Sequence, residues 1–410
     1  MQCGLLGEHL SHSFSPQIHA QLGTYPYRLY EVQPEGLGNF LNNTPFTGIN
    51  VTIPYKKAVI PYCKQLTPTA ALLGAVNTII RQSDGSLLGH NTDYAGFRSM
   101  VEHSGLDVGM KKVLVLGSGG ASATVVAVLK ELNANPVVIS RTGENNYSNL
   151  NKHADAAVIV NTTPVGMYPN NGLAPIDIDL FPTLEGILDL IYNPHRTALL
   201  MQAEKRNLVT ENGLWMLVAQ AKESAEYFTG SAIDDRIIQK IHTSLKKQTE
   251  NIVLIGMPGC GKSTVGSLLA NKLQRTFVDA DTEIEKEAGM SIPEIFARGG
   301  EQSFRKIEST VLERLGKKSG LVIATGGGCV TIPENYPHLH QNGIMIYLNR
   351  SIDTLPTDGR PLSNKDNLEI LYTVRKPLYE QFLDVSVANN GSIDDTVDHI
   401  LLMLSKGDLT

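Results

Sequence analysis

Residues 256–263 read GMPGCGKS, a glycine-rich segment that ends in a lysine and a serine. The segment satisfies the pattern G-x-x-x-x-G-K-[ST] and lies between an apolar run, NIVLI, and a helix-forming run, TVGSLLANKL. Backbone N–H groups of such a loop converge on phosphate oxygens at a helix N-terminus. This context favours an ATP site over an ordinary glycine-rich turn. The predicted nucleotide contacts are Gly259, Cys260, Gly261, Lys262, Ser263 and Thr264.

Within this loop, Lys262 is suited to neutralise the β- and γ-phosphates, and Ser263 is a candidate Mg²⁺ ligand. Two acidic residues follow in FVDADTEIE, Asp279 and Asp281, and their spacing predicts that both lie on the same side of a strand end. We expect Asp279 to serve Mg²⁺ indirectly and Asp281 to accept hydrogen bonds from substrate hydroxyls. A solvated acidic loop is the alternative for this motif alone.

Three arginines in separate later segments could together hold a small carboxylate. Arg305, Arg360 and Arg375 each carry a planar guanidinium, which suits a bidentate grip, although a single arginine usually serves solubility. In the segment ATGGGCV, a predicted strand runs into three glycines at 326–328. These glycines would let a ligand approach the backbone closely. These residues predict a substrate pocket beside the nucleotide.

An earlier segment, KKVLVLGSGGAS, is a predicted strand that runs into a second glycine-rich turn. The dinucleotide fingerprint G-x-G-x-x-G is incomplete because Ser122 occupies the place of the third glycine. The next predicted strand ends in SRT, with Arg141 where an NAD-binding protein would carry an acidic residue. An arginine there suits a 2′-phosphate, so NADP(H) is favoured, with a solvated loop arginine as the alternative.

Polar clusters also interrupt the first hundred residues. SHSFSP contributes Ser13 and Ser15, NVTIPYK contributes Thr52 and Lys56, GAVNT contributes Asn77, and GHNTD contributes Asp93. Singly, such residues commonly belong to turns. A lysine ammonium beside a carboxylate can, however, supply a proton in a reduction. Lys56 and Asp93 are of the residue types that such a step needs.

The P-loop and the motifs that follow it, across residues 251–410, together resemble shikimate kinase. The resemblance implies that Asp281 is the base for the 3-hydroxyl and that Arg360 is a lid arginine reaching over the phosphates. The lid segment, SIDTLPTDGRPLS, is shorter than is usual in that family, and no basic residue matches the one near the adenine. The implied shikimate contacts are Asp281, Arg305, Gly326, Gly327, Gly328 and Arg375.

The motifs of residues 1–243 together resemble shikimate dehydrogenase. SHSFSP, NVTIPYK, GAVNT, NTD, GSGGA, SRT, NTTPVGM, DLIYNP and VAQA occur in the family's order, whereas Pro68 stands where a cofactor-contacting acid is expected. Lys56 and Asp93 are implied to be the reacting pair. The implied substrate contacts are Ser13, Ser15, Thr52, Asn77, Asp93, Tyr192 and Gln220. The implied cofactor contacts are Gly117, Ser118, Gly119, Gly120, Ala121, Ser140, Arg141, Thr142, Leu190 and Gly213.

The two resemblances imply consecutive reactions: NADPH-dependent reduction of 3-dehydroshikimate to shikimate, and its phosphorylation by ATP to shikimate 3-phosphate. A quinate-preferring dehydrogenase joined to another polyol kinase is one alternative, and an inactive regulatory relative is another. The presence of Lys56, Asp93, Lys262, Ser263 and Asp281 argues against the inactive relative.

The elements that must hold these residues predict an α/β protein. Apolar runs alternate with helical stretches after Lys111 and again after residue 250, which indicates two parallel sheets. We expect a substrate-binding part at 1–104 plus about 211–243, and a Rossmann-type NADP part at 105–210. A polar linker is expected at 244–250, and a P-loop kinase domain at 251–410.

Composition sets broad limits. The chain has 410 residues, 42% of them hydrophobic and 19% charged, with a net charge of −6, which does not favour nucleic-acid binding. No apolar run approaches the roughly 20 residues of a membrane helix. The start shows no signal peptide, and four scattered cysteines suggest a reducing compartment, so a cytoplasmic enzyme with small-molecule substrates is expected. The oligomeric state is left open.

Overall fold

The computed structural model describes residues 1–10, 13–355 and 365–406. The chain divides into two compact units, the first formed by Met1–Tyr192 and Leu199–Leu245, the second by Asn193–Ala198 and Lys246–Thr410. The boundary after Leu245 falls inside helix α8 (Arg236–Thr249), so most of the stretch predicted as a linker is helical. The helix is amphipathic and buries Ile238, Ile241 and Leu245. The polar residues that suggested a linker therefore belong to the solvent-facing side of α8.

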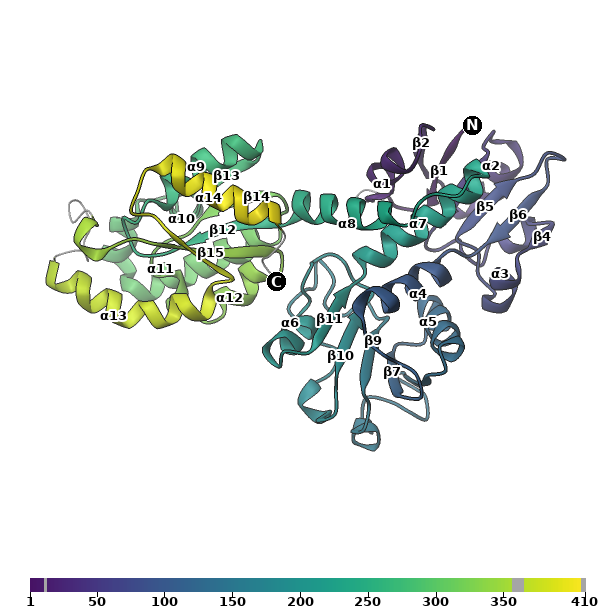
Figure 1. Ribbon diagram of the computed structural model, residues 1–410, viewed down its shortest axis with the longest axis horizontal. Coiled ribbons are helices and arrows are strands. Elements are labelled where there is room, and N and C mark those ends of the chain that lie inside the picture. Colours follow the sequence, from purple (N-terminus) through teal and green to yellow (C-terminus); the bar gives the residue numbers. More distant parts are fainter. Residues whose placement is uncertain (11–12, 356–364, 407–410) are drawn as a thin grey trace. The chain divides into compact units, whose positions relative to one another are not determined.

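The first part of unit 1 is built on a six-stranded mixed sheet in the order β2-β1-β3-β5-β6-β4 (Figure 1). β5 and β6 form the antiparallel hairpin that the turn at Asp84-Gly85 predicts. β3 pairs antiparallel with β5, so the carboxyl ends of β1, β3 and β6 meet the amino end of β5 at one edge. The strands are β1 (Cys3–Gly7), β2 (Tyr27–Glu31), β3 (Gly48–Val51), β4 (Gln65–Leu66), β5 (Thr78–Arg81) and β6 (Leu87–His90).

Helices from both ends of unit 1 pack on this sheet. α4 and α7 lie side by side (Figure 1), and α7 ends at Gly230, which has a left-handed backbone conformation. α1 begins at Ser15, with Phe14 at the cap position and Pro16 in the first turn. The helices are α1 (Ser15–Leu22), α2 (Leu37–Asn43), α3 (Pro68–Leu73), α4 (Asp93–Ser104) and α7 (Leu214–Thr229).

The second part of unit 1 is a five-stranded sheet in the order β11-β10-β9-β7-β8, and every pairing in it is parallel. This arrangement confirms the predicted alternation of strands and helices. The strands are β7 (Lys112–Leu116), β8 (Asn135–Ile139), β9 (Val158–Asn161), β10 (Gly186–Asp189) and β11 (Val209–Asn212). The helices beside them are α5 (Gly120–Glu131) and α6 (Ala198–Lys205).

Unit 2 holds the second parallel sheet, in the order β13-β14-β12-β15-β16. Its central strand β12 has β14 on one side and β15 on the other, a topological switch point at which α/β proteins bind ligands. The strands are β12 (Asn251–Ile255), β13 (Thr276–Asp279), β14 (Leu321–Ala324), β15 (Gly343–Asn349) and β16 (Val385–Ala388). The helices are α9 (Lys262–Leu273), α10 (Ala280–Ala288), α11 (Ile292–Gly316), α12 (Asn335–His340), α13 (Lys365–Phe382) and α14 (Ile393–Lys406).

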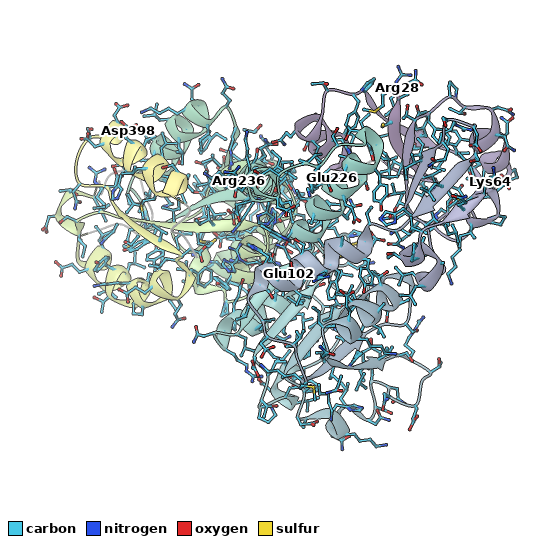
Figure 2. All side chains as sticks on the ribbon, turned by 45° about the vertical axis from the view of Figure 1, so that its right-hand side comes forward. Arg28, Lys64, Glu102, Glu226, Arg236 and Asp398 are labelled. Carbon is cyan, nitrogen blue, oxygen red and sulfur yellow. The ribbon has the colours of Figure 1, made fainter. Side chains whose placement is uncertain are left out.

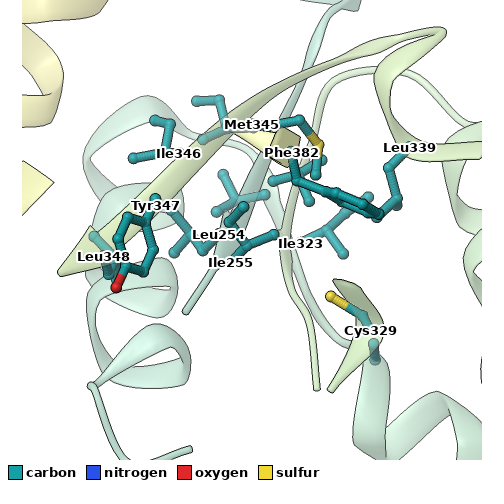
Figure 3. Close-up of a cluster of buried hydrophobic side chains, with 14 of the residues drawn as sticks. Leu254, Ile255, Ile323, Cys329, Leu339, Met345, Ile346, Tyr347, Leu348 and Phe382 are labelled. Carbon is teal, nitrogen blue, oxygen red and sulfur yellow. The ribbon is translucent and has the colours of Figure 1, made fainter. Parts of the chain in front are cut away.

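Short 3₁₀ helices complete both units: η1 (Pro34–Gly36), η2 (Ile60–Tyr62), η3 (Leu150–His153), η4 (Ile178–Leu180), η5 (Cys329–Thr331) and η6 (Ile352–Thr354). Each unit has hydrophobic cores of its own. In unit 2, Leu254, Ile323 and Leu348 are fully or almost fully buried around the sheet (Figure 3). Unit 1 contains three separate clusters. Each unit therefore buries the apolar surface that a domain needs.

The four cysteines are free thiols. Cys3, Cys260 and Cys329 are buried, whereas Cys63 is partly exposed. Charged side chains such as Lys64 and Glu102 lie on the surface, with side-chain exposures of 64% and 60% (Figure 2). Within the described part of the chain, no helix is both long and apolar enough to cross a bilayer.

Candidate active sites

The predicted reacting pair of unit 1 is brought together at the shared edge of the mixed sheet. Lys56 Nζ lies 2.6 Å from Asp93 Oδ2, although the residues are 37 positions apart. Lys56 lies in the turns after β3, and its backbone oxygen accepts a hydrogen bond from Val76 N at 2.8 Å. Asp93 is the first residue of α4. Both side chains remain partly exposed, at 34% and 18%, so a ligand can reach them.

The other predicted substrate contacts of unit 1 come from the same edge. Ser15 N donates to Ser13 Oγ at 3.2 Å in the turn between β1 and α1. Thr52 follows β3, Asn77 precedes β5, and Gln220 lies in α7. These segments meet because the carboxyl ends of β1, β3 and β6 and the amino end of β5 lie at one edge of the mixed sheet.

Tyr192 comes from the second part of unit 1, just after β10. Its ring lies 5.8 Å, centroid to centroid, from that of Phe14, which stands between the two serines of the SHSFSP motif. Burial raises the pKa of Tyr192, so its hydroxyl stays protonated and can donate a hydrogen bond. This contact joins the two parts of unit 1 at the predicted substrate site.

The predicted cofactor contacts line the carboxyl edge of the second sheet in unit 1. The glycine-rich turn at 117–121 links β7 to α5, and Ser140, Arg141 and Thr142 follow β8. Ser122, in place of the third glycine, is only 3% exposed, so the packing between helix and strand accommodates it. Arg141 and Thr142 are exposed at the surface.

Leu190 and Gly213 follow the neighbouring strands β10 and β11, and the structure places their backbones in contact. Gly213 N donates to Ile191 O at 3.0 Å. A Cβ atom added at Gly213 would collide with the carbonyl oxygen of Leu190. Only glycine therefore permits this close approach, which also starts α7.

In unit 2, the predicted residues surround a cavity of about 710 Å³ at the carboxyl edge of the sheet. The P-loop connects β12 to α9, and Lys262 is 8% exposed. Its Nζ donates to Gly256 O at 2.9 Å and to Met257 O at 3.0 Å. The predicted residues that line the cavity are Gly259, Gly261, Lys262, Ser263, Thr264, Asp279, Asp281, Arg305, Gly326, Gly327, Gly328 and Arg375. Cys260 is fully buried beneath the loop.

The two acidic residues lie in the cavity for a different reason from the one predicted. Asp279 ends β13, but Asp281 already belongs to α10, so strand alternation does not place them together. Asp279 is the helix cap, and its Oδ1 accepts a hydrogen bond from Asp281 N at 3.0 Å. Its other oxygen accepts from Ser263 Oγ at 2.6 Å. The predicted Mg²⁺ ligands are thus adjacent.

Burial raises the pKa of Asp281, and the negative charge of Asp279 raises it further. Lys262 and Arg305 oppose this effect. A carboxyl group with a raised pKa is a better proton acceptor at neutral pH, as long as it remains ionised.

The arginines differ in their surroundings. Arg305 donates from Nη1 to Glu308 at 2.7 Å, and a Cβ at Gly328 would overlap its guanidinium, so the glycine makes room for the arginine. Arg375 is 5% exposed and donates to Gly327 O at 3.2 Å. Arg360 lies outside the described residues.

Sequence reasoning missed several residues of this cavity. Glu308 is fully buried, and one of its carboxylate oxygens has no hydrogen-bond partner in the described structure. Its spacing of three from Arg305, on a helix, could have indicated the ion pair. Phe296 and Phe304 form an apolar wall, stacked at 4.9 Å between ring centroids. Their spacing alone does not distinguish them from core residues.

Comparisons with known proteins find a match for a part of each unit. The family description "Shikimate dehydrogenase substrate binding domain" matches residues 5–79, and "Shikimate kinase" matches residues 258–405. A shikimate dehydrogenase (NADP(+)) of Clostridium beijerinckii is 32% identical over 265 residues, which is 60% of this chain and 98% of that protein. The chain belongs to the shikimate dehydrogenase family. Its second unit carries a shikimate kinase domain.

Solved structures match the dehydrogenase part. A shikimate 5-dehydrogenase of Thermus thermophilus, in complex with NADP(H) and shikimate, is 29% identical, with a TM-score of 0.55 over 60% of this chain and 99% of that one. A quinate dehydrogenase of Corynebacterium glutamicum, in complex with NAD, is 26% identical, with a TM-score of 0.55 over 60% and 99%. The bifunctional chain thus combines shikimate dehydrogenase and shikimate kinase activities of the shikimate pathway.

Proposed function

We propose that unit 1 reduces 3-dehydroshikimate with NADPH and that unit 2 phosphorylates the 3-hydroxyl of the resulting shikimate with ATP and Mg²⁺. The observation that carries the proposal is the contact between Lys56 and Asp93, at 2.6 Å, on the sheet edge where the predicted substrate contacts gather. The family assignment gives the two activities, and the geometry supports the residue roles.

In the reduction, NADPH supplies the hydride to the carbonyl carbon. Lys56 donates a proton to the carbonyl oxygen, and Asp93 orients the ammonium through their ion pair. Ser13, Ser15, Thr52, Asn77, Tyr192 and Gln220 bind the other polar groups of the substrate. Tyr192 bridges the substrate part and the cofactor part, because it follows β10 and packs against Phe14.

The exposed position of Arg141 after β8 supports a role in binding the 2′-phosphate of NADPH. A charge-assisted contact of this kind contributes ~1.5–3 kcal/mol. We therefore expect Arg141→Ala to raise the KM for NADPH by at least tenfold and to leave the KM for NADH nearly unchanged. Steady-state rates with both cofactors measure this, and equal use of NADPH and NADH by the unmodified enzyme would contradict the role.

In the phosphorylation, Asp281 accepts the proton of the 3-hydroxyl, while Lys262 neutralises charge on the phosphates. Lys262 can exchange its hydrogen bonds to Gly256 O and Met257 O for phosphate oxygens. Ser263 and Asp279 fit Mg²⁺, because a hydroxyl and a carboxylate are hard oxygen ligands and lie 2.6 Å apart here. Arg305 and Arg375 bind the substrate carboxylate, and Arg360 acts on the phosphates.

A coupled assay tests the whole proposal. The full-length protein is supplied with 3-dehydroshikimate, NADPH, ATP and Mg²⁺, and both NADPH loss and ADP formation are followed. ADP should form only after NADPH oxidation begins. In a parallel assay with NADP⁺, shikimate should be oxidised with a higher kcat/KM than quinate. ADP formation without any reduction, or a preference for quinate, would overturn the corresponding assignment.

A further inference from the structure

A buried group of polar side chains lies behind the proposed dehydrogenase substrate site. We call it the substrate-edge network. Its members come from β3, β5, the β6–α4 turn and α7, and those outside α7 are at most 6% exposed. Buried polar groups are costly unless they are hydrogen-bonded, so each donor here must find an acceptor. The members are Asn50, Asn77, Thr78, Thr92, Gln220 and Ser224.

The partners of the two proposed substrate amides fix their orientation. Gln220 faces Leu217 O, which can only accept, so its Nε2 donates there at 2.9 Å and its Oε1 faces Thr92 Oγ1 at 3.2 Å. Asn77 Oδ1 accepts from Thr92 N at 2.7 Å, so its Nδ2 donates to Thr92 Oγ1 at 3.0 Å. Each NH₂ group retains one hydrogen with no acceptor in the described part of the chain. That hydrogen is available to a substrate hydroxyl.

Ser224 connects this pair to the rest of the network. Tyr27 donates to Asn50 Oδ1 at 2.8 Å, so Asn50 Nδ2 faces Ser224 Oγ, also at 2.8 Å. Ser224 Oγ also lies 3.0 Å from Gln220 O, 3.0 Å from Thr78 Oγ1 and 3.1 Å from Thr92 Oγ1. Ser224 donates its hydrogen to the backbone oxygen of Gln220, because that atom only accepts, and Thr78 donates to Asn77 Oδ1. The lone pairs of Ser224 then accept from Asn50 Nδ2 and from the Thr92 hydroxyl, whose single hydrogen is shared between Ser224 Oγ and Gln220 Oε1.

We infer that Ser224 is a positioning residue of the dehydrogenase. It is fully buried, so its side chain offers no surface to a bound substrate. It holds the Thr92 hydroxyl, and Thr92 in turn sets the direction of the Asn77 and Gln220 amides. Removing the hydroxyl leaves Asn50 Nδ2 with one acceptor fewer and lets Thr92 rotate, so both amides lose their fixed direction. This inference rests on the proposed substrate role of those two amides.

The first test replaces Ser224 by alanine in the full-length protein. Ser224→Ala should raise the KM for shikimate about tenfold, which is the effect of losing about one hydrogen bond of 1.4 kcal/mol. The kcat should change less than about twofold, and the KM for NADP⁺ should not change. Thr229→Ala is the matched control, because Thr229 also lies in α7 and donates to the carbonyl four residues earlier, Ala225 O, at 2.8 Å. Its kinetics should be those of the unmodified enzyme.

An unchanged KM for NADP⁺ in the same samples shows that unit 1 of each variant protein is folded. A second test uses Thr92→Val alone and combined with Ser224→Ala. If Ser224 acts through Thr92, the double variant should have a KM within about twofold of that of Thr92→Val. Three results would overturn the inference: KM changes of the two substitutions that multiply in the double variant, an unchanged KM in Ser224→Ala, or an equal rise of the KM in Thr229→Ala.

Gln220→Ala tests the proposed function separately. An unchanged KM for shikimate in this variant would exclude Gln220 as a substrate contact, while the Ser224→Ala result would still decide the role of Ser224.

Discussion

At the scale of single residues, the dehydrogenase chemistry depends on one ammonium group. Lys56 is held by Asp93 at 2.6 Å, and its neighbour Lys57 is exposed. The two lysines are therefore a natural pair for comparison, since they share sequence context and charge but differ in partner.

We expect Lys56→Ala to lower NADPH oxidation about 10²–10⁴-fold, because the variant lacks the proton donor of the reduction. Lys57→Ala should retain normal rates. Both variants should phosphorylate supplied shikimate normally, because the P-loop lies in the other unit. Initial rates of both reactions measure these effects, and a loss of kinase turnover in folded Lys56→Ala protein would argue against independent sites.

Asp281 gives the kinase reaction a predictable pH dependence. Burial, Asp279 and Glu285 all raise its pKa, so Asp281 binds a proton at a higher pH than an ordinary aspartate does. Protonated Asp281 cannot accept the substrate proton, and kcat/KM should fall as the pH drops through the raised pKa. Glu285→Gln removes one negative neighbour, which lowers the pKa and should move the acidic limb to lower pH. Glu287→Gln, on the same helix, should leave it in place. A limb that moves upward in Glu285→Gln would contradict this assignment.

Local residues explain why part of each site could be predicted from the sequence. Lys262 and Ser263 follow a continuous pattern of glycines between an apolar run and a helix, and all of that information is local. The contacts of Ser224 with Asn50 span 174 positions. Glu308 faces Arg305 three positions away, but it is buried in a cavity that Asp281 and Gly326, from distant segments, also line. Such contacts depend on the tertiary fold, which a single sequence does not show.

At the scale of elements, glycines cap both ends of α7, and they do so for different reasons. Gly213, at the amino end, allows the backbone of Leu190 to come close. Gly230, at the carboxyl end, has φ of 68°, and a Cβ there would meet no neighbouring atom. The first glycine is required by packing at the proposed cofactor edge, and the second by backbone conformation alone.

Alanine at each position should separate these two requirements. Gly213→Ala should raise the KM for NADPH several-fold and lower the melting temperature, because Leu190 must move. Gly230→Ala should cost about 1 kcal/mol of stability through its left-handed backbone and leave the KM unchanged. Thermal melts and NADPH titrations provide the measurements. Equal changes in KM in both variants would show that lost stability, rather than the Leu190 contact, is responsible.

The elements also show where pattern reasoning was wrong. Apolar runs correctly predicted β7, β8 and β12, because a strand buried on both faces is apolar at consecutive positions. Asp281 was placed at a strand end, yet Asp279 already caps α10. The acidic residues Asp281 and Glu283 in the first turn are typical of a helix start, and they could have indicated it.

At the scale of the whole molecule, each of the two units is formed by two separate segments of the chain. Residues 193–198 cluster with unit 2, although they follow β10 of unit 1 in sequence. Within unit 2, His195 N donates to Asn342 Oδ1 at 3.1 Å, and Arg196 N donates to Gln341 O at 2.8 Å. No local pattern indicates such an excursion, because its partners lie almost 150 positions away.

Because buried cysteines lie in both units, their reaction with a thiol reagent can report the unfolding of each unit separately. Cys3 lies in unit 1, whereas Cys260 and Cys329 lie in unit 2, and burial protects all three from reagents. Cys63 is partly exposed, but burial raises its pKa to about 11, so it reacts slowly at neutral pH. Short pulses of a maleimide at increasing urea concentrations should label Cys3 and the Cys260–Cys329 pair in two separate transitions, because each unit has its own core. Peptide mass mapping measures the midpoints, and a single shared midpoint would mean that the two enzymes unfold as one cooperative body.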